Sequence, residues 1–216
     1  MLKLYDYWRS SAAYRVRIGL NLKGAAYESA PVNIAPGKDE QFSAAFRSLN
    51  PQMRVPALET SQGLITQSLA ILVWLDQTYA EPRFVPADPY EGALVRAFAL
   101  TIACDIHPMN NLAVLGRLKS QFGADEEQIG DWYRHWIALG FEALEAQVAA
   151  RPERGFVFGD APGLADICLV PQMANARRYA LDLAPYPRLV ALDERARAHP
   201  AFAAAAPENQ QGAVKA

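Results

Sequence analysis

The chain has 216 residues, of which 51% are hydrophobic, and its formal net charge is -2. That balance argues against a general nucleic-acid-binding protein, which needs a basic excess. No run of about 18 apolar residues is free of charges or helix breakers, so we expect no membrane-spanning helix. The N-terminal segment lacks a basic stretch followed by an apolar one, which argues against a secretory signal and favours the cytoplasm.

The cysteines and histidines are scattered along the chain. Cys104 and Cys168 form no Cys-x-x-Cys pair, and His107, His135 and His199 lack the spacing of a zinc site. We therefore expect no metal site. Both cysteines fall in apolar, helix-like stretches, so each is expected to be a small buried core residue.

The first 80 residues alternate between strand and helix patterns. Residues 2–8 alternate loosely and are rich in aromatics, which is typical of a strand. Ser10 and Ser11 stand where a helix N-cap belongs, and Gly24 follows that helix as a C-terminal stop. The remaining pattern predicts strands at 27–34, 55–59 and 64–66, and helices at 14–23, 40–46 and 69–78, the last capped by Ser68.

From Pro82 onward only helical patterns remain. Residues 82–89 are rich in Pro, Ala and Asp, which indicates a linker. Predicted helices then cover 90–122, bent or broken at Pro108, followed by 125–150, 164–179 and 187–198. The apolar stripe expected to face the core from the 125–150 helix consists of Ile129, Trp132, Trp136, Leu139 and Leu144.

This element order predicts an α/β thioredoxin-like N-terminal domain followed by an all-α C-terminal domain. A βαβ unit, a hairpin and a final helix leave few alternative topologies, because crossovers are right-handed and connections are short. The expected ranges are 1–81 for the first domain, 82–89 for the linker and 90–216 for the helical domain.

The turn after the first strand contains no thiol. It runs from Arg9 through Ser10 and Ser11 to Arg15, whereas redox proteins of this architecture carry Cys-x-x-Cys there. A hydroxyl, a helix N-terminus and Arg9 suit an anion that comes from outside, such as the thiolate of a bound cofactor. The same serines also suit a simple helix cap, and the residues alone leave both interpretations open.

Four stretches together resemble one family. They are residues 9–18 (RSSAAYRVRI), 49–58 (LNPQMRVPAL), 67–71 (QSLAI) and 105–112 (DIHPMNNL), and residues 174–187 add to the match. The chain resembles the zeta class of glutathione transferases over nearly its whole length. The resemblance implies the soluble glutathione transferase fold, glutathione as cofactor, a homodimer, and glutathione-dependent cis–trans isomerisation of maleylacetoacetate to fumarylacetoacetate in tyrosine and phenylalanine breakdown.

The resemblance also implies a role for individual residues. Ser10 is expected to hold the thiolate, with Ser11 beside it, and Val55 to pair with the cysteinyl unit next to a cis bond at Pro56. The γ-glutamyl carboxylate is expected at Gln67 and Ser68. His107 and Asn111, four residues apart and hence on one helical face, are expected near glutathione and substrate.

The chain departs from the family pattern at two positions. Ala12 stands where the family has a cysteine, and Gly163 stands where it has Ser or Thr. Glycine is an acceptable cap, and we expect Asp166 to reach back to the N–H groups of that turn in a structural role.

The implied reaction needs cationic groups for a small dicarboxylate substrate. The thiolate adds to the double bond, the bond rotates, and loss of the thiol leaves the trans product. Arg9 and Arg178 are the candidates for binding the carboxylates, because guanidinium binds carboxylate in bidentate fashion. Arg177 could exchange roles with Arg178, although neighbours on a helix point about 100° apart. Arg15 is expected outside the site, in a structural ion pair.

Three alternatives remain at this stage. The same chemistry could act on maleylpyruvate of gentisate breakdown. A conjugating transferase would join glutathione to electrophiles without regenerating it. A non-catalytic module would bind glutathione without turnover. Neither a membrane nor a nucleic acid is expected as a partner.

Overall fold

The computed structural model describes residues 1–213, so the last three residues of the expected helical domain lie outside the described part. The chain divides into two compact units. The first consists of Met1–Arg83 together with the residues from Ala198 on, and the second is Phe84–Arg197. The C-terminal residues thus group with the thioredoxin-like part, whereas the expected range placed them in the helical domain.

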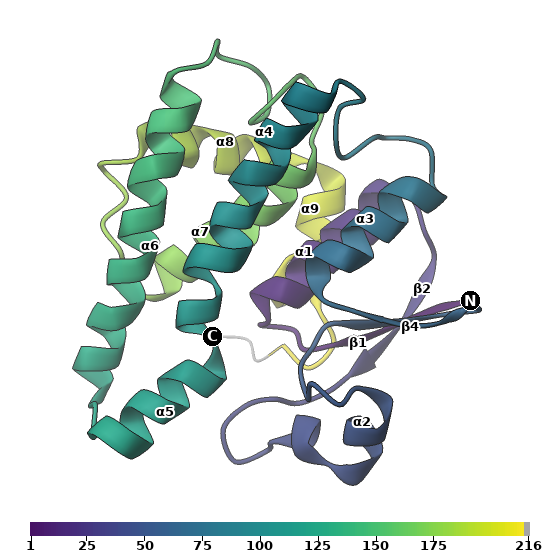
Figure 1. The fold of residues 1–216 in the computed structure, drawn as a ribbon, viewed down its shortest axis with the longest axis vertical. Helices are drawn as coiled ribbons and strands as arrows, with labels where there is room; N and C mark the ends of the chain where they lie inside the picture. Colours follow the sequence, from purple (N-terminus) through teal and green to yellow (C-terminus); the bar gives the residue numbers. More distant parts are fainter. Residues whose placement is uncertain (214–216) are drawn as a thin grey trace. The chain divides into compact units, whose positions relative to one another are not determined.

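The first unit is built on a four-stranded sheet with the order β2-β1-β3-β4 (Figure 1). Strand β1 (Leu2–Asp6) pairs in parallel with β2 (Tyr27–Pro31) and antiparallel with β3 (Ala57–Thr60), which forms a hairpin with β4 (Gly63–Thr66). Helix α1 (Ser11–Leu22) crosses between the parallel strands, and α3 (Ser68–Thr78) follows the hairpin. The thioredoxin-like arrangement expected for the N-terminal part is therefore confirmed.

The two faces of the sheet are covered by different helices. Helices α1 and α3 pack together on one face, while η1 (Glu40–Phe42) and α2 (Ala44–Leu49) lie on the other (Figure 1). Because strand side chains alternate, Leu4 and Tyr5 of β1 point to opposite faces, and Tyr5 packs edge-on against Phe46 of α2. The expected single helix over 40–46 is thus two short helices.

An unexpected short helix completes the first unit. Helix α9 (Pro200–Ala205) packs against α1. The Arg17 Nε donates to the Ala205 carbonyl at 2.9 Å, and Asn21 donates to the Ala201 carbonyl at 3.0 Å. The short helix η4 (Pro207–Asn209) follows it.

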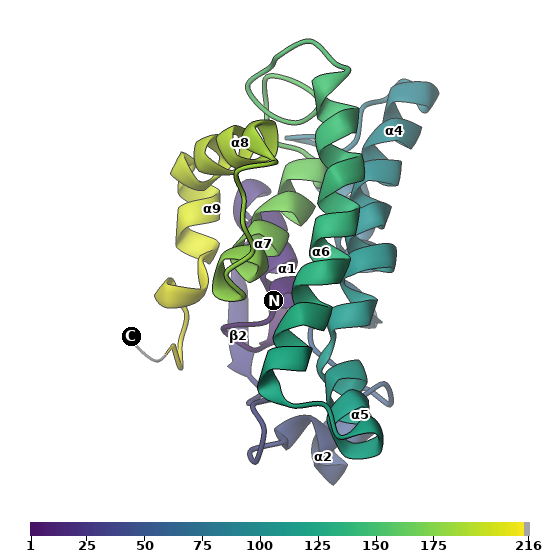
Figure 2. The ribbon, with the colours of Figure 1, turned by 90° about the vertical axis from the view of Figure 1, so that its left-hand side faces the viewer.

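All regular elements of the second unit are helices. Its central helix α7 (Leu164–Arg178) packs against both α4 (Pro89–Leu100) and α6 (Glu126–Ala149), as Figures 1 and 2 show. The expected break near Pro108 is confirmed, but it is longer than expected: a π-helix η2 (Thr101–Ile106) and a 3₁₀ helix η3 (Pro108–Asn110) separate α4 from α5 (Leu112–Phe122). Helix α8 (Pro187–Ala198) has the expected bounds.

Two expectations about burial are wrong in part. Ile129 and Leu144 of the stripe predicted for α6 are buried as expected, but Leu139 is 53% exposed. The buried face of α6 also includes Tyr133, Ile137, Phe141 and Val148. Cys168 is buried as expected, whereas Cys104 is exposed.

Neither a membrane-crossing helix nor a metal-binding group is found in the described part of the chain. No helix within residues 1–213 is long and apolar enough to cross a bilayer. No three histidine, cysteine, aspartate or glutamate side chains within that range are grouped to hold a metal ion.

Candidate functional site

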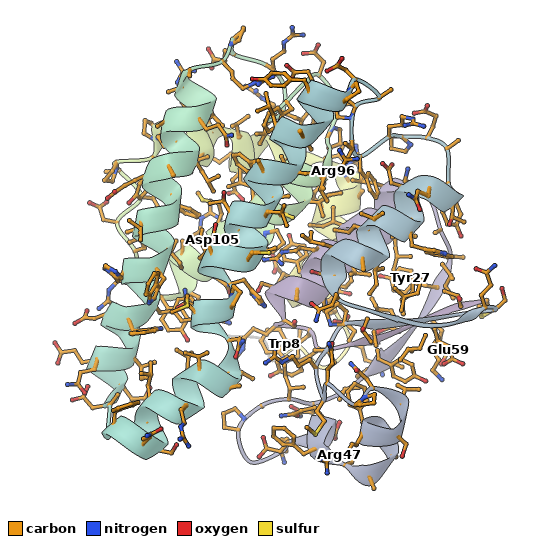
Figure 3. The ribbon with its side chains drawn as sticks, viewed as in Figure 1. Trp8, Tyr27, Arg47, Glu59, Arg96 and Asp105 are labelled. Atoms are coloured by element: carbon orange, nitrogen blue, oxygen red, sulfur yellow. The ribbon has the colours of Figure 1, made fainter. Side chains whose placement is uncertain are left out.

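The first candidate region is the turn between β1 and α1. Trp8, labelled in Figure 3, lies just after β1, and the exposed guanidinium of Arg9 is 5.5 Å from the centre of its ring. Ser10 is the N-cap of α1: its Oγ accepts a hydrogen bond from the Ala13 N–H at 3.2 Å. Ser11 is buried as the first helical residue. Capping uses the oxygen of Ser10 as an acceptor, so the hydroxyl keeps its hydrogen for donation to an anion.

The second candidate region is the bond between Val55 and Pro56. This bond is cis, as expected. Val55 packs in an apolar cluster with Tyr7, whose carbonyl accepts from the Ser10 N–H at 2.9 Å, so this region adjoins the turn that carries Ser10. Val55 is only 9% exposed, yet within residues 1–213 neither its main-chain N–H nor its carbonyl forms a hydrogen bond. Buried main-chain groups are normally hydrogen-bonded, so the N–H and carbonyl of Val55 are available to an extended peptide.

The third candidate region is the start of α3. Gln67 occupies the N-cap position with φ 70° and ψ 119°, a backbone conformation that side chains rarely adopt. Ser68 is the first helical residue rather than the cap that the sequence predicted, and it is buried. The side-chain amide of Gln67 donates to the Gln52 Oε1 at 3.1 Å. Strained backbone at a helix N-terminus is a combination found at anion-binding sites.

Arg15 links α1 to this third region. Its side chain is buried, and Nη1 lies 3.5 Å from the Ser68 Oγ. The buried cation therefore lies next to the first turn of α3, close to one of the expected glutathione residues. The sequence alone predicts a position for Arg15 outside the site.

The segment 107–111 belongs to the second unit and differs from the prediction. His107 is half-buried at the end of η2, and Asn111 has an extended backbone with φ -78° and ψ 158°. The two residues therefore do not share one helical face. The Asn111 Oδ1 caps α5 by accepting from the Ala113 and Val114 N–H groups at 2.9 and 3.2 Å.

The two adjacent arginines of α7 have different partners. Arg177 forms an ion pair with the buried Asp193. Burial raises the pKa of Asp193, and the hydrogen bond from Arg177 opposes that shift. Arg178 donates from Nη2 to the Tyr133 Oη at 3.3 Å, and within residues 1–213 no carboxylate pairs with it. Arg178 is therefore the arginine whose charge is left for a ligand.

The start of α7 explains the glycine at position 163. The Asp166 carboxylate accepts from the Gly163 N–H at 2.9 Å and the Val157 N–H at 3.0 Å, as expected for its structural role. Burial raises the pKa of Asp166 to about 6, against the opposing effect of these hydrogen bonds. A Cβ at position 163 would lie 2.9 Å from the Phe84 carbonyl oxygen, so this close approach favours glycine over the Ser or Thr of the family pattern.

Both units contain segments that match known protein families. Residues 1–77 match the N-terminal domain of glutathione S-transferases, and residues 132–204 match the C-terminal domain of the same enzymes.

Similarity to individual proteins narrows the family to one class of glutathione transferases. The chain is 48% identical to a maleylpyruvate isomerase of a Ralstonia species (97% of this chain, 98% of the relative) and 45% identical to the maleylacetoacetate isomerase of Pseudomonas aeruginosa (97% of each). Among solved structures it is similar to holo maleylpyruvate isomerase, described as a bacterial zeta-class glutathione S-transferase (TM-score 0.95, 46% identity, 98% of this chain and 100% of that one). Another is the maleylacetoacetate isomerase of Methylobacterium extorquens AM1 with bound malonate and glutathione (TM-score 0.94, 36% identity, 99% and 100%). The chain belongs to the zeta class of glutathione transferases.

Proposed function

We propose that this protein is a glutathione-dependent isomerase that converts maleylacetoacetate to fumarylacetoacetate. The observation that carries the proposal is the position of Ser10. It stands at a helix N-terminus where a redox protein has a thiol, and its hydroxyl caps the helix while keeping a hydrogen to donate. Because Ala12 stands where the family has a cysteine, the reacting sulfur must come from the cofactor.

The residues of the first unit fit glutathione along its length. Ser10 and Ser11 suit the sulfur at the N-terminus of α1. The open main-chain pair of Val55, next to Pro56, suits the cysteinyl peptide unit. The strained Gln67 and the buried Ser68 suit the γ-glutamyl carboxylate at the N-terminus of α3. We therefore assign glutathione binding to the expected N-terminal domain, residues 1–81.

Glutathione supplies a thiolate that adds to the substrate double bond and leaves again after the bond has rotated. The protein holds that thiolate in its charged form, because a hydroxyl hydrogen bond and the helix dipole at Ser10 both lower the pKa of a thiol. Arg9 and Arg178 bind the two carboxylates of the substrate. Both side chains are exposed, and no carboxylate of the described residues occupies either of them.

We assign supporting roles to two further residues of the helical domain, the expected substrate-binding part of the chain. His107 and Asn111 would contact glutathione or substrate. The side-chain oxygen of Asn111 is used in capping α5, whereas its amide N–H groups donate to no residue within 1–213 and remain for a ligand. His107, four residues earlier in the chain, is half-buried.

A second candidate substrate is maleylpyruvate. It is supported by the name of the Ralstonia relative, whose 48% identity to this chain equals that of the Vibrio cholerae relative named probable maleylacetoacetate isomerase. We further propose that the protein works in the cytoplasm as a homodimer, and that maleylacetoacetate reaches it from tyrosine and phenylalanine breakdown.

The test is a side-by-side assay of the purified protein. Maleylacetoacetate and maleylpyruvate are each supplied with and without glutathione, and both the trans product and the free thiol are quantified. We expect glutathione-dependent formation of the trans product with a constant amount of free thiol, and a higher kcat/KM for maleylacetoacetate. Loss of thiol on chloro-dinitrobenzene without isomerase activity would identify a conjugating transferase instead. Retention on immobilised glutathione without any turnover would identify a binding module.

A further inference from the structure

Arg178 is held by two tyrosine rings. Tyr133 of α6 and Tyr179 stack with their ring centres 3.5 Å apart and their planes within 8° of each other. The guanidinium carbon of Arg178 lies 5.0 Å from the Tyr179 ring centre and 5.9 Å from that of Tyr133. Its Nη2 also donates to the Tyr133 Oη at 3.3 Å. A flexible arginine at the end of a helix therefore has two aromatic contacts and one hydrogen bond.

The tyrosine pair is itself fixed from several sides. Tyr133 is only 3% exposed, and its carbonyl accepts from the Asn110 side-chain amide at 3.2 Å. The Tyr179 carbonyl accepts from the Arg134 Nη1 at 3.2 Å. The support beneath Arg178 is therefore anchored to η3, α6 and α7.

The same turn of α6 also holds the segment that follows His107. The Trp132 indole N–H donates to the Met109 carbonyl at 2.9 Å, next to the bond that Asn110 makes with Tyr133. Two consecutive residues of α6 thus contact both the 107–111 segment and Arg178, the two parts of the helical unit to which the proposed function assigns ligand contacts.

We infer that Tyr133 is a positioning residue that orients Arg178 toward a carboxylate of the substrate. This inference rests on the proposed function, because it assumes that Arg178 binds substrate. An exposed arginine that is already held in place loses less conformational freedom when it binds, so orientation appears in the affinity for the dicarboxylate. The phenolic oxygen of Tyr133 supplies the direction, since it is the one hydrogen-bond acceptor that Arg178 reaches among the described residues.

The test compares two tyrosine substitutions of equal size. Tyr133→Phe keeps the ring stack and removes the acceptor for Arg178. Tyr179→Phe also keeps the stack, and its hydroxyl forms no hydrogen bond within residues 1–213, so it is the matched control. We expect Tyr133→Phe to raise the substrate KM and the inhibition constant of malonate by about 3- to 10-fold, the scale of one ordinary intramolecular hydrogen bond. The control and the glutathione KM should not change.

Arg178→Ala separates this inference from the proposed function. We expect Arg178→Ala to raise the substrate KM, and Tyr133→Phe to add nothing on that background, because both changes remove the same interaction. Equal effects of Tyr133→Phe with and without Arg178 would overturn the inference, as would a Tyr133→Phe enzyme with the wild-type substrate KM. An unchanged KM in Arg178→Ala would instead overturn the role of Arg178 in the proposed function. Urea unfolding of each variant verifies that the fold is intact.

Discussion

Arg17 Nη1 lies 2.7 Å from Asp6 Oδ1 and 2.9 Å from Asp6 Oδ2, and both side chains are buried. The same guanidinium donates to the carbonyls of Trp8 and Ala205. The pair therefore joins the end of β1, the middle of α1 and the end of α9. It also lies immediately before the turn that carries Ser10, so it fixes the scaffold on which the proposed thiolate site is built.

Breaking this buried ion pair should greatly lower the free energy of unfolding. Arg17→Met leaves the Asp6 carboxylate buried without its partner, and we expect a loss of about 3–5 kcal/mol in the free energy of unfolding. Urea denaturation measures this. The matched control is Arg154→Met, which breaks a pair with Asp160 in which both side chains are more than half exposed, and it should have little effect. Equal losses in the two variants would contradict the structural role of the Asp6–Arg17 pair.

Ser10 should contribute both to the stability of the protein and to its turnover. Ser10→Ala removes an N-cap and should cost about 1 kcal/mol of stability. It should also cut isomerase turnover by about 10²-fold, the scale of losing one well-placed donor to a developing or stabilised anion. Ser43→Ala removes the equivalent cap of α2, which accepts from Phe46 N–H at 3.2 Å. We expect the same loss of stability there with normal turnover. Near-normal turnover of Ser10→Ala would remove Ser10 from the mechanism.

The strained backbone of Gln67 should lower stability and favour glutathione binding. Gln67→Gly relieves a side chain held at φ 70°, so we expect about 1 kcal/mol of added stability together with a glutathione KM raised by several-fold. Ala180→Gly, at φ 52°, is the control: it should also add stability and should leave the glutathione KM unchanged. The measurements are urea unfolding and initial rates at varied glutathione. A stabilised Gln67→Gly with unchanged glutathione KM would show that the strain serves no binding role.

The Asp166 carboxyl should make stability fall as pH rises. Its pKa is raised by burial from 3.8 to about 6, so between these values the unfolded chain loses its proton before the native protein does. The native state then binds more protons, and by linkage the free energy of unfolding decreases through this range and levels off above pH 6. In Asp166→Asn this dependence disappears. The stability of the wild type relative to the variant should therefore decrease by up to about 3 kcal/mol between pH 4 and pH 7. A constant difference over that range would contradict the shifted pKa.

Much of the architecture can be predicted from the sequence, because the decisive signals are local. The alternation in β1, the two serines at the start of α1, and the turn residues of the β3–β4 hairpin identify their elements directly. The short helix α9 was missed because its Ala-rich sequence has no amphipathic stripe, and its stability comes from packing on α1. The π-helix η2 was missed because its residues have the apolar pattern of an ordinary helix.

Parts of the candidate site could be predicted where the signal is local, and parts could not where it depends on distant residues. Ser10, Val55 and Gln67 could be named as candidates because short motifs mark them. The choice between Arg177 and Arg178 could not be made, since it depends on Asp193 and Tyr133, which lie elsewhere in the chain. Asn111 was assigned to the wrong geometry because a break in a helix changes the direction of every side chain that follows it. Helical spacing allows two adjacent apolar stripes on α6, and the more deeply buried one contains Tyr133, Ile137 and Phe141 in place of Trp132, Trp136 and Leu139.

The contact between α9 and α1 has a consequence for biosynthesis. Ala201 and Ala205, whose carbonyls accept from Asn21 and Arg17, are synthesised after the helical unit, although their partners belong to α1. In chain order the helical unit is an insertion between two segments of the first unit. During translation the sheet and α1 therefore remain without their final layer while about a hundred residues of helix are added. The first unit can be completed only after the helical unit has been synthesised.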